Sequence, residues 1–221
     1  MSHLLRIRLP DVPGSLGAVA TAIGEVGANI EAIEIVEHGS DGTAVDDVFV
    51  DLRPEVLPDV VVSAVQRLDG VEVVWVSRYG VGGNLNLDLE VVETITDDPR
   101  NAVRRLTELV PGAFRADWAL VAESVGGGAD GSARRVEATR GAPDLPDTDP
   151  GWFPLRQATR WSSDREWAGW SNMEVAAAPL GSPDRAIVFG RFGGPEILDS
   201  ELARLNHLAA LTMSITTAAV G

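Results

Sequence analysis

The amino-acid sequence predicts an α+β fold made of two units, each pairing an antiparallel sheet with helices. Three observations lead to this prediction. Strand-like alternation and helix-like spacing follow one another over residues 1–79 in the order βαββαβ. The glycine-rich segment 80–84 then indicates a boundary. Beyond it, helical patterns enclose strand patterns, so the second half is also α+β.

The elements of the first unit are predicted from periodicity. Residues 4–9 alternate apolar and charged side chains, the pattern of a strand with one buried face. Apolar residues then recur every three or four positions from Leu16 to Val26, which predicts a helix that ends at Gly27. The remaining elements follow in order: a strand around 33–35, a strand at 48–52, a helix at 61–68 and a strand at 71–78.

The second unit begins with an ambiguous segment. Residues 85–96 fit both the alternation of a strand and the stripe of a helix, and we favour the helix because a strong helix start follows at Asp98. We assign residues 1–79 to the first domain, 80–96 to a linker and 97–221 to the second domain. The elements predicted in the second domain are a helix at 98–110, strands at 116–124, 133–138, 174–179 and 185–192, and a closing helix at 200–219.

A motif lies where the first strand meets the first helix. Pro13 suits a first helical turn because its fixed φ and missing N–H cost little there, and Gly14 lets a small ligand approach the backbone. The next N–H groups lie at the positive end of the helix dipole, where they could bind a carboxylate. The motif consists of Asp11, Val12, Pro13, Gly14, Ser15 and Leu16, and a second segment, Asn29-Ile30, follows the helix.

These two segments together resemble the ACT domain, a ferredoxin-like βαββαβ module, over about residues 4–79. The resemblance implies an amino acid or similar small regulator as ligand, usually bound across a dimer interface. The helix N–H groups from Gly14 to Leu16 would take the ligand carboxylate. Asn29 would bond its polar groups, and Asp11 would accept from its ammonium. The structural alternative is that Asp11 only caps the helix and Asn29 only forms a turn.

The second half resembles a GAF-like domain over about residues 97–219. GAF domains are small-molecule sensors and dimerisation modules, so the resemblance implies one of these roles here. The segments that carry it are 115–121, which follows a helix, 176–182, and 190–195 with 200–205.

Aromatic residues gather in the same half and form a second candidate pocket. Such side chains could stack on a planar ligand or hold a cation, but they more often pack a loop-rich wall onto a sheet, and we favour packing. The candidate pocket residues are Trp161, Arg165, Trp167, Trp170 and Asn172.

Composition excludes several classes of function. The formal net charge is −15 and all 18 basic residues are arginine, which argues against a nucleic-acid or membrane partner. The chain has no cysteine, so catalysis by a thiol is excluded. A GAF-like methionine-sulfoxide reductase is excluded as well, because its cysteines are missing. His3, His38 and His207 show no metal spacing and no evident partner. The glycines of 126–131 precede a strand pattern, so a dinucleotide site is rejected.

The sequence therefore predicts a non-catalytic regulatory protein that binds an amino acid at a dimer interface. We expect a cytoplasmic homodimer without a cofactor or a metal. Two alternatives stay open. The chain could be a pure dimerisation or protein-interaction module, or an enzyme that uses the C-terminal aromatic pocket.

Overall fold

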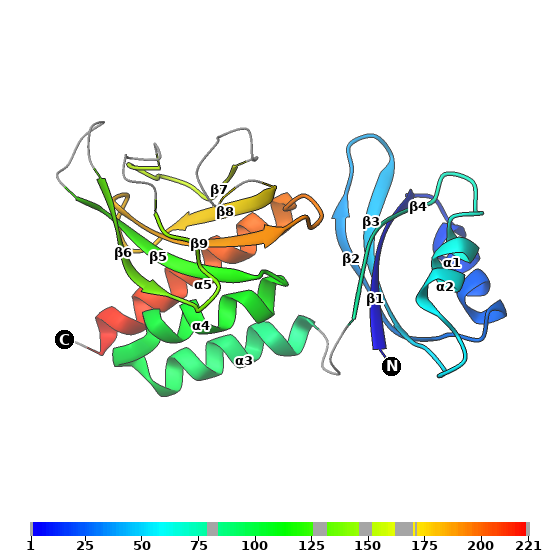
Figure 1. Cartoon of the computed structure of the whole chain (residues 1–221), viewed down its shortest axis with the longest axis horizontal. Coiled ribbons are helices and arrows are strands. Elements are labelled where there is room, and N and C mark those ends of the chain that lie inside the picture. The colour runs from blue at the N-terminus through cyan, green and yellow to red at the C-terminus, as the bar shows by residue number, and fades with distance from the viewer. Residues whose placement is uncertain are drawn as a thin grey trace. The chain divides into compact units, whose positions relative to one another are not determined.

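The computed structural model describes residues 2–78, 84–125, 132–145, 152–161, 170 and 172–219. The chain divides into two compact units, Met1–Gly83 and Asn84–Gly221 (Figure 1). Each unit has its own antiparallel sheet and its own helices, which confirms the predicted α+β class.

The first unit has the predicted order βαββαβ. Its four-stranded antiparallel sheet has the strand order β2-β3-β1-β4, and both helices lie on one face of it (Figure 1). That face is apolar because alternate residues of the strands, including Leu5, Ile7 and Val48, pack against Val19 and Val61 of the helices. The elements are β1 (Ser2–Pro10), α1 (Ser15–Glu25), β2 (Asn29–His38), β3 (Thr43–Asp51), α2 (Pro58–Val65) and β4 (Glu72–Arg78).

The other face of this sheet holds a buried ion pair. The alternation in β1 suggests that Arg6 faces solvent, but the structure leaves its side chain only 2% exposed. Its Nε and one terminal nitrogen donate to the two carboxylate oxygens of Asp47 on β3, at 2.8 and 3.0 Å. This two-bond geometry is the strong form of an arginine–carboxylate contact and compensates the burial of both charges.

The second unit has a five-stranded antiparallel sheet with the order β6-β5-β9-β8-β7. The predicted hairpins are confirmed, whereas the short edge strand β7 was not predicted, because three residues are too few to show a period. The elements are α3 (Asn84–Asp97), the 3₁₀ turn η1 (Pro99–Asn101), α4 (Ala102–Phe114), β5 (Trp118–Val125), β6 (Ser132–Ala138), β7 (Thr159–Trp161), β8 (Met173–Pro179), β9 (Arg185–Phe192) and α5 (Asp199–Ala218).

Helix α3 occupies most of the segment predicted as a linker. The preference for a helix over a strand at 85–96 is confirmed. The segment nevertheless packs as part of the second unit, because Val91 and Ile95 are buried in that unit's core. Arg204 of α5 also binds the Asp88 carboxylate through Nε at 2.8 Å. The amphipathic stripe thus faces the neighbouring helices instead of bridging two domains through solvent.

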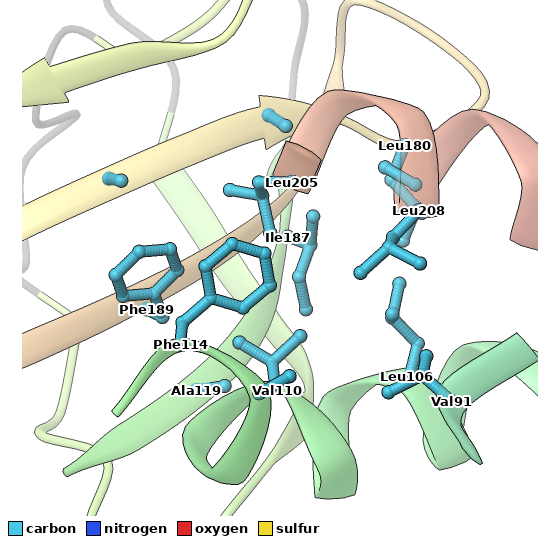
Figure 2. Close-up of a cluster of buried hydrophobic side chains, with 14 of the residues drawn as sticks. Val91, Leu106, Val110, Phe114, Ala119, Leu180, Ile187, Phe189, Leu205 and Leu208 are labelled. Carbon is cyan, nitrogen blue, oxygen red and sulfur yellow. The ribbon is translucent and has the colours of Figure 1, made fainter. Parts of the chain in front are cut away.

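The core of the second unit lies between α3, α4 and α5 and one face of the sheet (Figure 2). Phe114 at the end of α4 stacks on Phe189 of β9, with ring centroids 5.0 Å apart. Arg191 and Glu201 close one end of this layer as a buried ion pair. The Arg191 guanidinium also donates to the carbonyl of Phe114, so a single side chain connects α4, β9 and α5.

Candidate functional site

The β1–α1 turn is held by a left-handed glycine. Gly14 is the N-cap of α1 with φ 97°, a conformation that side chains rarely adopt. A Cβ added there would meet no atom within 4 Å, so the chain requires glycine for its backbone angle and not for space. Ser15 N–H donates to the carbonyl of Val12 at 3.2 Å, and Val12 itself is 58% exposed. The turn therefore presents backbone and one apolar side chain to solvent.

Asp11 and His38 form a pair beside this turn. The Asp11 carboxylate lies 2.9 Å from Nδ1 of His38, the last residue of β2. Both side chains are substantially exposed, at 49% and 63%. The expectation that His38 has no acidic partner was wrong, because β2 runs parallel to β1 on the far side of β3 and ends at the same edge. No side-chain hydrogen bond caps α1, so Asp11 does not take the capping role.

A third polar side chain, Asp46 of β3, lies in the same part of the unit. It is only 2% exposed, and its Oδ1 has no hydrogen-bond partner among the described residues. Burial raises the pKa of Asp46 above its usual value of 3.8, and the nearby charge of His38 opposes that rise. The protonation of Asp46 is therefore coupled to the charges that gather at Asp11 and His38.

Asn29 lies at the opposite end of the same sheet. In the strand register, Asn29 of β2 pairs with Asp51 at the end of β3, and Asp51 pairs with Ser2 at the start of β1. The end of β1 is at the other end of the sheet, where Pro10 pairs with Thr43. The 11 residues of α1 separate Gly14 from Asn29, a length of about 16 Å. Within one chain, the structure thus keeps the segment 11–16 apart from Asn29 and Ile30. We call the end formed by segment 11–16, His38 and Asp46 the β1–α1 pole.

The second candidate pocket is only partly described, since Arg165, Trp167 and the side chain of Trp161 lie outside the described residues. Trp170 is 2% exposed and meets Trp118 edge to face, with centroids 5.0 Å apart. Its Nε1 donates to the carbonyl of Asp144 at 3.0 Å. Asn172 is exposed and has a positive φ of 59°. Trp118, Trp152 and Trp170 therefore pack the sheet face opposite the helices, in agreement with the favoured interpretation.

Residues 3–70 match the family model of the ACT domain. Residues 3–70 form an ACT domain. The match agrees with the predicted resemblance and with the βαββαβ order of the first unit. It indicates a regulatory module of the kind that binds small ligands. The β1–α1 pole lies entirely within this domain.

One similar protein is NAD-dependent malic enzyme 1 of Bacillus subtilis (strain 168), which is 40% identical over 78 residues. The match covers 35% of this chain and 18% of that enzyme, so the chain spans less than a fifth of its relative. The activity of the enzyme is a property of that longer protein.

Solved structures also resemble the chain. Free methionine-R-sulfoxide reductase from Neisseria meningitidis is 12% identical with a TM-score of 0.49, covering 65% of this chain and 96% of that one. The GAF domain of an Acinetobacter phosphoenolpyruvate-protein phosphotransferase is 10% identical with a TM-score of 0.43, covering 62% and 95%. A GAF domain is thus among these neighbours. At these TM-scores the likeness carries no argument about chemistry.

The described residues also bear on two other classes of site. No group of three or more His, Asp or Glu side chains in the described part of the chain is arranged to hold a metal ion. None of the described helices is both long and apolar enough to cross a membrane.

Proposed function

We propose that this protein is a non-catalytic regulator that binds an amino acid at the β1–α1 pole of its ACT domain. The observation that carries the proposal is the exposed pair of Asp11 and His38 beside the left-handed N-cap of α1. An ammonium group would be attracted by the Asp11 carboxylate, and a carboxylate by the first N–H groups of the helix. An α-amino acid carries both groups on one carbon atom.

The buried Asp46 adds to the preference for a ligand with an ammonium group. A positive charge placed at the pole would favour the ionised form of Asp46, as the charge of His38 already does. Binding of an ammonium group would then be linked to loss of the Asp46 proton. A neutral or purely anionic ligand has no such linkage.

Asn29 can join this site only from a second copy of the chain. Strand β2 is an edge of the sheet, and an antiparallel pairing of two β2 edges places opposite ends of the two sheets side by side. That symmetry would bring Asn29 of one subunit to the β1–α1 pole of the other. We therefore propose a homodimer with two equivalent ligand sites, each shared between subunits.

The oligomeric state is the first test. Sedimentation at micromolar concentration should give a dimer of the 23.4 kDa chain. A monomer at that concentration would contradict the shared site. A thermal-shift screen with the twenty amino acids should then identify a stabilising ligand, and calorimetry should measure its affinity. A substrate that the protein turns over would instead support an enzyme.

Variants then locate the site. Asp11→Asn and Asn29→Ala should each weaken ligand binding at least tenfold. The first removes the charge that attracts the ammonium group, the second removes a hydrogen bond to a charged group, and each loss costs about 1.5–3 kcal/mol. Asp69→Asn removes the same charge as Asp11→Asn at an exposed position after α2 and serves as the matched control. Parent-like affinity in both site variants would place binding elsewhere in the chain.

Mixing the two variants tests the sharing itself. A mixed dimer contains one Asp11→Asn subunit and one Asn29→Ala subunit. One of its two sites then lacks both groups. The other site combines Asp11 of the Asn29→Ala subunit with Asn29 of the Asp11→Asn subunit, so both groups are intact. Tight binding should therefore return at about a quarter of all sites after random subunit exchange, since half of the dimers are mixed. If each site used both residues of one chain, mixing would restore nothing.

A further inference from the structure

A concave site lies at the end of the first unit that is opposite the β1–α1 pole. It is a pocket of about 270 Å³ that is formed entirely within this unit. Its position follows from the strand register, since Ser2 pairs with Asp51 at this end and Pro10 with Thr43 at the other. Eight residues of β1 thus separate it from the β1–α1 pole, a distance of about 26 Å. The lining residues are His3, Leu52, Arg53, Pro54, Val56, Leu57, Pro58 and Arg78.

Three basic side chains converge on this pocket. His3 of β1 and Arg78 of β4 are direct cross-strand partners, and Arg53 follows the end of β3 on the other side of β1. The ends of three neighbouring strands therefore bring together groups that are far apart in the sequence. This convergence is unusual in a chain with a formal net charge of −15. We call the site the cationic pocket.

The two arginines of the cationic pocket are available to a ligand. In the described part of the chain, neither Arg53 nor Arg78 takes part in an ion pair, and both are exposed. No acidic residue lines the pocket, although Glu55 and Asp59 flank the lining segment in sequence. Asp59 accepts a hydrogen bond from Val60 N–H at the start of α2. The pocket thus presents cationic donors without a carboxylate among its lining residues.

The rest of the pocket is apolar. Leu52 is buried, Val56 is half-buried, and Leu57 extends from the rim with 60% of its surface exposed. A bare inorganic anion would use the arginines and leave this surface in water. An anion with a short hydrocarbon chain would use both.

We infer that the cationic pocket binds a small organic anion, namely a carboxylate with an apolar tail of a few carbons. Arg53 and Arg78 hold the carboxylate, and Leu52, Val56 and Leu57 cover the tail. The ligand is held at the point where the chain leaves the sheet of the first unit, because Arg78 is the last residue of β4. This inference is independent of the amino-acid site proposed above.

Calorimetry at low salt tests the inference with acetate, butyrate, hexanoate and inorganic phosphate as probes. Affinity should rise about fourfold for each methylene that becomes buried, so hexanoate should bind more tightly than butyrate, acetate or phosphate. Equal affinity for all four probes would overturn the apolar part of the site. No binding of hexanoate at 10 mM, a concentration on the order of the weakest useful affinities, would overturn the site as a whole.

Charge-matched variants then locate the hexanoate. Arg53→Gln and Arg78→Gln should each weaken it about tenfold or more. Arg67→Gln removes the same charge from an exposed position after α2 that does not line the pocket, and it should bind like the parent. An equal loss in Arg67→Gln would show diffuse attraction only. The control for the second unit is Arg156→Gln, since Arg156 lines a separate cavity of about 470 Å³ there, and a loss in this variant would move the ligand to that cavity.

A fifth variant tests for indirect effects. Leu57→Glu places a negative charge at the rim, on a side chain exposed enough for the fold to tolerate it. It should abolish hexanoate binding without lowering the melting temperature. Asp11→Asn, at the other end of the domain, should leave hexanoate binding unchanged. Failure of either expectation would contradict a site confined to the cationic pocket.

Discussion

The two regions that the sequence marks as candidate binding sites differ in exposure and in chemistry. The β1–α1 pole presents Asp11, His38 and Val12 to solvent around a backbone turn. The aromatic cluster of the second unit buries Trp118, Trp152 and Trp170 to 2% exposure or less. An accessible, polar and pre-shaped turn is suited to bind a ligand, whereas interlocked rings are suited to hold a sheet face together. Aromatic density alone therefore does not indicate a pocket.

The largest effect is expected from Trp170→Ala. Removing this buried ring leaves a cavity beside Trp118 and deletes the bond to the Asp144 carbonyl, so unfolding should become easier by about 3–5 kcal/mol. Chemical denaturation measures the change. Val136→Ala, on an exposed position of β6, should stay within about 0.5 kcal/mol. A variant of Trp170 with parent-like stability that no longer binds a ligand would reverse the comparison and make the cluster the pocket.

A smaller effect is expected from Gly14→Ala at the β1–α1 pole. The φ of 97° is strained for any residue with a Cβ, so the cost should be about 1–2 kcal/mol. Gly17→Ala makes the same chemical change at an exposed position inside α1, and it should stabilise by about 0.5–1 kcal/mol. Denaturation of both variants checks the opposite signs. Equal signs would show that the turn does not depend on the left-handed glycine.

The buried Asp46 makes the stability of the pole depend on pH. Because its pKa is raised in the folded state, the native protein holds this proton more tightly than the unfolded chain. Stability is therefore lost as pH rises from the usual value of 3.8 through the raised pKa. Asp46→Asn is neutral throughout, so its melting temperature should exceed that of the parent at neutral pH, with a gap that closes as pH falls towards 3.8. A gap independent of pH would contradict the raised pKa.

The smallest effect on stability is expected from Asp11→Asn. Its partner His38 and the carboxylate itself are both exposed, and such pairs contribute about 0–1 kcal/mol. The same variant should weaken the proposed amino-acid ligand at least tenfold. A large loss of stability together with unchanged amino-acid binding would show that the Asp11–His38 pair is structural. The β1–α1 pole would then stabilise the fold, as the aromatic cluster does, and would not bind the ligand.

The sequence predicted the fold well because periodicity reports local burial. Every strand and helix of the first unit was predicted in the right order. Gly27 marked the end of α1, whereas Gly70 lies well beyond Val65, the last residue of α2. The sequence was less informative about which side chains meet across neighbouring strands. Arg6 has the spacing of an exposed residue, yet Asp47, which is 41 positions away, allows its burial. The contact of His38 with Asp11 likewise depends on strand register, which no local pattern encodes.

The same limit explains the placement of Asn29. Two segments at the ends of one helix are neighbours in the motif, but a helix of 11 residues holds them apart in the fold. The motif therefore groups these residues in the sequence, whereas the fold of one chain holds them apart. The cationic pocket was missed for a related reason, because His3, Arg53 and Arg78 come from three strands and share no motif.

The packing of α3 in the second unit decides where the chain can be cut to isolate that unit. Arg204 binds Asp88 and also lies over the Phe114 ring, 4.2 Å from its centroid. A truncated fragment that starts at residue 97, the domain bound read from the sequence, would lose Asp88, Val91 and Ile95. It would thereby open the buried surface of α4 around Leu106 and Val110 to water and invite aggregation. A fragment of the second unit should therefore include the whole of α3 and begin at residue 84.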